Sequence, residues 1–122
     1  MRLRSALALP ALVAGLALSA YAADISGQWT ATFNTQVGEQ NYTYTFKVDG
    51  EKLTGTAKSA NGETEIQNGV VKGDDVSFVE NLDYQGQKLV ITYTGKVSGD
   101  EIKFTRDVAG AAKEELVAKR VK

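Results

Sequence analysis

The amino-acid sequence predicts an all-β fold, in which eight antiparallel strands form an up-and-down meander that closes into a barrel. Two observations lead to this prediction. Apolar and polar residues alternate in short runs from residue 28 onward, which is the period of a sheet with one buried face. The runs are separated by short segments rich in glycine, which are typical of hairpin turns. A two-sheet β-sandwich is the alternative fold.

Eight alternating runs can be assigned as strands. They span residues 28–33, 41–48, 52–59, 63–71, 75–81, 87–97, 101–107 and 114–121. Every second residue of a run is expected to point into the barrel, while the residues between them face water. The positions expected to point inward are Trp29, Ala31, Phe33, Tyr42, Tyr44, Phe46, Val48, Leu53, Gly55, Ala57, Val76, Phe78, Leu89, Ile91, Tyr93, Ile102 and Phe104.

The turns between the runs share a pattern of their own. The motif V-x-G-[DE]-x-[LVI] occurs three times, at residues 48–53, 71–76 and 97–102. Its glycine supplies the positive φ that a tight reversal requires, and the aliphatic residue on each side holds the two strands in register. Because the connections are short, consecutive strands must be neighbours, which predicts a meander. Closing the meander into a barrel hides the strand edges that would otherwise promote aggregation.

The first 22 residues are typical of a signal peptide. Arg2 and Arg4 precede an apolar stretch that is shorter than the ~20 residues needed to span a bilayer, and Ala20-Tyr21-Ala22 provides small residues for cleavage after Ala22. We therefore expect one β-barrel domain over residues 23–122, located in the periplasm or outside the cell, with no membrane insertion after cleavage. With no cysteine in the chain, neither a lipid anchor on cysteine nor a disulfide is expected.

The composition argues against several functions. Without Arg2 and Arg4, 12 basic residues face 15 acidic ones with no basic cluster, so nucleic acid is not an expected partner. Histidine and cysteine are absent, which removes the usual general base, the thiol nucleophile and the best transition-metal ligands. No cofactor, metal site or catalytic residue is therefore predicted. The adjacent acids at 74–75, 100–101 and 114–115 are expected to lie on the solvated surface.

A charged pair follows from the alternation. In phase with the inward apolar residues of their runs are Glu80 and Arg106, so both are expected to point into the barrel. Because a buried charge is costly unless it is paired, the two side chains either neutralise each other or present a polar end to a ligand. Tyr42, Tyr44 and Tyr93 share the inward register and either line a cavity or pack as core. These five residues are the candidate ligand-binding site.

The first run resembles the opening strand of a known barrel family. Gly27-Gln28-Trp29 resembles the G-x-W opening of the calycins, which include lipocalins, fatty-acid-binding proteins and avidins. The resemblance implies that the tryptophan closes one barrel end against an arginine of a late strand, for which Arg120 and Arg106 are the candidates. We take Gly27, Trp29 and Arg120 as the predicted closure. The similarity to avidins extends to Lys52-Leu53-Thr54-Gly55-Thr56, but the chain has a single tryptophan, so biotin is not an expected ligand.

The chain from residue 23 onward also resembles a class of short exported bacterial domains. The shared patterns are S-G-x-W, F-K-V-D-G-x-K-L-T-G and K-V-S-G-D-x-I-K-F. No established activity comes with this resemblance, and its shared residues are turns and core positions.

Three functions remain compatible with the sequence. The first is a non-enzymatic binding module that holds a small apolar or amphipathic ligand, or a glycan, at one barrel mouth. The second is a structural or protein-interaction domain with a filled barrel. The third is a carboxylate-dependent hydrolase, which would need two acids ~5 to 10 Å apart.

Overall fold

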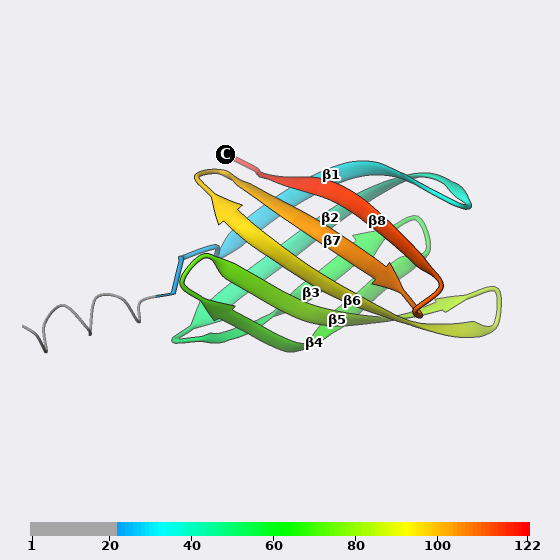
Figure 1. The fold of residues 1–122 in the computed structure, drawn as a ribbon, viewed down its shortest axis with the longest axis horizontal. Helices are drawn as coiled ribbons and strands as arrows, with labels where there is room; N and C mark the ends of the chain where they lie inside the picture. The colour runs from blue at the N-terminus through cyan, green and yellow to red at the C-terminus, as the bar shows by residue number, and fades with distance from the viewer. Residues whose placement is uncertain (1–21) are drawn as a thin grey trace, which may run out of the picture.

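The fold is an eight-stranded antiparallel meander that closes into a barrel (Figure 1). A computed structural model describes residues 22–122, so the predicted signal peptide lies outside the described residues except for Ala22. The strands are β1 (Gly27–Thr35), β2 (Gly38–Asp49), β3 (Lys52–Ser59), β4 (Gly62–Lys72), β5 (Asp75–Tyr84), β6 (Gln87–Ser98), β7 (Glu101–Val108) and β8 (Ala112–Arg120). Each strand pairs with the next and β8 pairs with β1, which confirms the predicted barrel and excludes the sandwich.

The three repeated glycine motifs form hairpins of one kind. In each, two residues separate the last paired positions of the two strands, as between Asp49 and Lys52. The first loop residue is the glycine, with φ of 64° at Gly50, 57° at Gly73 and 61° at Gly99. The residue after it keeps a negative φ, which makes these type II′ turns. The motif therefore predicts the turn geometry as well as the turn positions.

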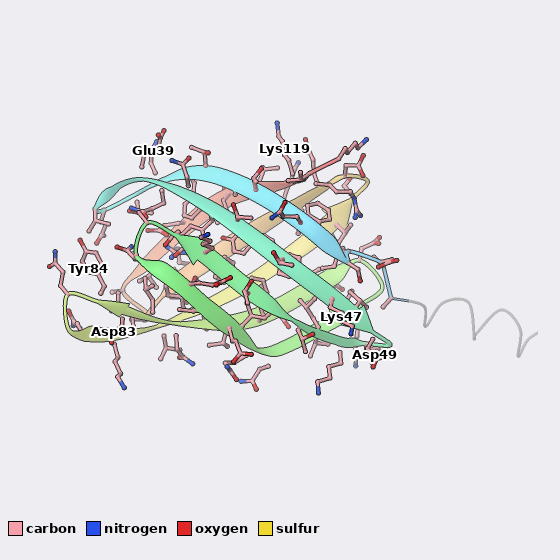
Figure 2. All side chains as sticks on the ribbon, turned by 180° about the vertical axis from the view of Figure 1, so that it is seen from behind. Glu39, Lys47, Asp49, Asp83, Tyr84 and Lys119 are labelled. Carbon is pink, nitrogen blue, oxygen red and sulfur yellow. The ribbon has the colours of Figure 1, made fainter. Side chains whose placement is uncertain are left out.

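The turns divide the barrel into two ends (Figure 1). The β2–β3, β4–β5 and β6–β7 turns gather at one end together with Gly27 and Arg120, and we call this the closed end. The other four turns, which join β1 to β2, β3 to β4, β5 to β6 and β7 to β8, gather at the opposite end, which we call the mouth. In Figure 2, Lys47 and Asp49 mark the closed end, and Asp83 and Tyr84 mark the mouth.

Aromatic rings fill the barrel interior. Phe78 stacks on Tyr93 with ring centroids 4.3 Å apart, and Tyr44 meets Tyr93 edge to face at 5.8 Å. Phe46 and Phe104 pack around them, and all five residues are buried. Offset and edge-to-face contacts of this kind add to the stabilisation from burial. The middle of the barrel is thus a packed core, as the alternation predicts.

One strand departs from simple alternation. The pairing of β4 with β5 shifts register between Gln67 and Val70, and Asn68 has a positive φ of 54°. A β-bulge of this kind adds a residue to one strand and changes which face the following residues occupy. Ile66 and Val71 are therefore both buried although they are separated by an odd number of positions. The unbroken alternation expected for residues 63–71 is wrong at this point.

The barrel is closed by a short seam. The strands β1 and β8 pair at only two positions, Trp29 with Arg120 and Thr30 with Lys119. Toward the mouth the two strands diverge (Figure 1). A groove of about 980 Å³ follows this seam, and its rim carries the exposed side chains of Lys103, Glu115 and Lys119.

Candidate functional site

At the closed end, Trp29 and Arg120 make the contact that the resemblance implied. The Trp29 side chain is fully buried, and its indole Nε1 donates a hydrogen bond of 2.9 Å to the carbonyl oxygen of Ile25. The guanidinium carbon of Arg120 lies 4.5 Å from the centre of the indole ring. Of the two candidate arginines, Arg120 therefore covers the tryptophan, whereas Arg106 lies inside the barrel.

Arg120 is held in place by the chain around it. Its Nε donates to Asp100 Oδ1 at 3.1 Å, and its Nη1 and Nη2 donate to the carbonyl oxygens of Ser26 and Asp24 at 3.3 Å and 3.2 Å. Gly27 lies beside it with a φ of 126°, a backbone conformation that side chains rarely adopt. The three predicted closure residues thus meet and tie the N-terminal segment to the last strand.

The five predicted site residues form one hydrogen-bonded network inside the barrel. Glu80 accepts a bond from the Tyr42 hydroxyl at Oε2 (3.1 Å) and from the Tyr93 hydroxyl at Oε1 (2.9 Å). The Tyr44 hydroxyl donates to the Tyr93 oxygen at 3.0 Å. Arg106 donates from Nε to the Tyr93 oxygen at 2.9 Å and from Nη2 to the Tyr42 oxygen at 3.0 Å. Its Nη2 also lies 3.9 Å from Glu80 Oε1, as expected for a buried ion pair.

The hydrogen-bond partners of Glu80 fit an ionised carboxyl. The three tyrosine protons all find acceptors because the Glu80 carboxyl accepts two bonds and the Tyr93 oxygen accepts the third. A protonated carboxyl would bring a fourth proton into the same space. Burial nevertheless raises the pKa of Glu80 above its ordinary value, while the charge of Arg106 acts in the opposite direction. Burial, together with the nearby Glu80 charge, also raises the pKa of Tyr42 to about 12.

The closest charged partner of Arg106 is Glu114, which the sequence interpretation had placed on the surface. Arg106 Nη1 donates to Glu114 Oε1 at 2.5 Å, and the Glu114 side chain is only 10% exposed. The surface assignment was wrong for this residue because β8 alternates strictly and places Glu114 in phase with the buried Leu116 and Ala118. Its neighbour Glu115 points outward, as expected. The apolar residues Leu116 and Ala118, in phase with Glu114, were the signal that could have identified it as pointing inward.

A pocket of about 220 Å³ opens at the mouth above this network. Tyr42, Arg106 and Glu114 line it together with mostly apolar walls, which include Leu82, Leu89, Ile91 and Val108. Tyr84, which ends β5 at the mouth (Figure 2), and Ala111, in the turn between β7 and β8, also line the pocket.

Of the five predicted ligand-binding residues, two reach this pocket. Tyr42 and Arg106 line it, whereas Tyr44, Glu80 and Tyr93 do not and are almost completely buried. Tyr93 and Glu80 contact Arg106 directly, and the Tyr44 hydroxyl donates to the Tyr93 oxygen. Sequence reasoning missed the walls, because they come from strand ends that meet only when the barrel closes.

The larger groove along the seam is a weaker candidate. Its charged residues, Lys103, Glu115 and Lys119, are exposed and therefore fully solvated. The mouth pocket instead brings two charged side chains, each nine-tenths buried or more, to an apolar cavity. Such convergence of a few polar groups in an apolar pocket is characteristic of ligand sites.

The chemistry open to a molecule in the pocket is limited. Glu114 is the carboxylate that lines it, and Glu80 lies beneath the tyrosines, so the two acids that glycosidic hydrolysis requires do not face a common substrate space. Within residues 22–122, no three acidic side chains are grouped to hold a metal ion. The same residues include no helix long and apolar enough to cross a membrane.

Comparisons of the chain with protein-family models, with curated protein sequences and with solved structures give no match.

Proposed function

We propose that this protein is a non-enzymatic binding module, exported to the periplasm or beyond, that holds a small amphipathic molecule in the mouth pocket. The observation that carries the proposal is the polar floor of the pocket, where Arg106 and Glu114 are fixed by a buried network beneath apolar walls. A rigid floor of this kind holds a ligand's polar group without first having to be ordered.

The size and lining of the pocket restrict the ligand. Its volume of about 220 Å³ corresponds to roughly seven water molecules at about 30 Å³ each. This space suits one small ring or a short branched chain. Because the walls are apolar, an amphipathic molecule fits them better than a glycan, whose many hydroxyl groups would lose their bonds to water.

The test is a titration of the ¹⁵N-labelled protein with phenol, indole, cyclohexanol and methyl glucoside, followed by two-dimensional NMR. We expect at least one of the apolar probes to shift the amide signals of Leu82, Leu89 and Val108 in a saturable manner. The signals of the closed end should stay in place. Leu89→Asn should weaken the binding because it adds a polar group to the wall, whereas Val90→Asn on the outer face serves as the matched control.

A second function would follow from the opposite result. If no probe shifts the signals of the mouth, the binding proposal is wrong. The protein is then better described as an interaction domain with a filled barrel, for which the packed aromatic core is the supporting observation. Such a domain would meet its partner through the outer face.

We also propose kinship with the calycin barrels. The support is the contact between the opening tryptophan and the late-strand arginine, at the closed end of an eight-stranded meander.

A further inference from the structure

The charge balance at the pocket floor points to the kind of ligand. Two carboxylates, Glu80 and Glu114, surround the single guanidinium of Arg106. When all three are ionised, this group carries one net negative charge. Such an excess is costly because Glu80 is fully buried and Glu114 is nine-tenths buried, so water screens the two carboxylates only in part. A positively charged group entering the pocket would relieve this cost.

Arg106 already uses three of its five N–H groups within the protein. Its three side-chain nitrogens all donate within the protein: Nε to Tyr93, Nη1 to Glu114 and Nη2 to Tyr42. An anionic group close to the guanidinium would also come close to the two carboxylates. The floor of the pocket therefore disfavours binding of a carboxylate or phosphate group.

Glu114, by contrast, has an acceptor to offer. Its Oε1 receives the bond from Arg106, and no hydrogen bond to its Oε2 is found within residues 22–122. The side chain is nine-tenths buried and lines the pocket. A carboxylate oxygen held in this way is a strong acceptor for a charged N–H donor.

From these observations we propose that the mouth pocket binds a small organic amine in its protonated form. The ammonium group donates to Glu114 Oε2, and a compact apolar body fills the space between Leu82, Leu89 and Ile91. This inference deepens the proposed binding function and depends on it.

The experiment compares three probes of similar shape by the same NMR titration at about pH 7, where an alkyl amine is protonated. The probes are 2-phenylethylamine, 2-phenylethanol and phenylacetate, which differ in charge but share the phenyl ring. We expect the amine to bind about ten times more tightly than the alcohol, and the carboxylate to bind least. Glu114→Gln should remove this preference while Glu115→Gln, one residue away on the outer face, should leave it unchanged.

Each other result of this titration would overturn the amine inference or both proposals. Equal binding of amine and alcohol would overturn the amine inference and leave the proposed binding function in place. Tightest binding of phenylacetate would overturn it too and would make Arg106 the anchor. Failure of all three probes and of the earlier panel would overturn both proposals. If Glu114→Gln does not fold, the comparison of the three probes on the unaltered protein still decides the question.

Discussion

Arg106→Met is expected to lower the free energy of unfolding by about 3–5 kcal/mol at neutral pH. Methionine fills a similar volume but leaves Glu80 and Glu114 without a cation in the barrel interior. It also removes the donors to the Tyr42 and Tyr93 oxygens. Breaking a buried charged network by removing one partner is among the most destabilising changes in proteins. Urea denaturation followed by tryptophan fluorescence measures the effect.

The matched control for this variant is Lys103→Met, on the outer face of the same strand. It removes the same charge from an exposed position and should change the free energy of unfolding by no more than about 0.5 kcal/mol. If Arg106→Met costs less than about 1 kcal/mol, the two carboxylates are not buried as described. Adding Glu80→Gln to Arg106→Met should recover part of the loss, because it removes one unpaired charge.

Trp29→Ala is expected to cost about 3–5 kcal/mol, as is typical when a large aromatic side chain is removed from a core. The indole is fully buried, bonds to Ile25 and lies under Arg120, so its loss leaves a cavity at the closed end. Thermal unfolding followed by circular dichroism measures the change.

Arg120→Ala removes the guanidinium group that lies over the Trp29 indole ring. This variant removes a cation–π contact worth about 0.5–1 kcal/mol at a partly exposed site. It also removes the three hydrogen bonds to Asp100, Ser26 and Asp24, so its cost should exceed that of the cation–π contact alone but stay below that of Trp29→Ala. Equal losses from the two variants would show that the closed end depends on the arginine clamp and not on burial of the indole.

Most of the fold could be predicted from the sequence because its physical causes are local. The alternation of β1, β2 and β5–β7 and the glycine motifs each act within a few residues. The strand ends were less predictable: β2 begins at Gly38, whereas the predicted run begins at residue 41, because the tip of this strand carries no apolar residue on its inner face. The bulge near Asn68 could not be predicted either, because nothing in the alternation marks an inserted residue.

The candidate site could be predicted only in part. In-phase counting along single strands placed Glu80, Arg106 and the three tyrosines inside the barrel. Their hydrogen bonds depend on which residues face one another across the barrel, which no single strand specifies. The pocket is harder still to predict from local sequence, because its walls come from strand ends and hairpins far apart in the chain.

The buried carboxyl has a consequence for pH. Because the pKa of Glu80 is raised in the folded protein, the folded state holds a proton over a pH range in which the unfolded chain has already lost it. The contribution of Glu80 to stability is therefore greatest below the ordinary glutamate pKa. It decreases as the pH rises from that value through the raised one.

The most direct test of the buried hydrogen-bonded network around Glu80 and Arg106 is the pH titration of the Glu80 side-chain carboxyl carbon by ¹³C NMR. We expect a single transition above the ordinary glutamate pKa of about 4.3, ending in the ionised form that accepts bonds from Tyr42 and Tyr93. A transition at or below the ordinary value would show that burial does not dominate the environment of this carboxyl, and would contradict the raised pKa expected for a carboxyl buried in the network.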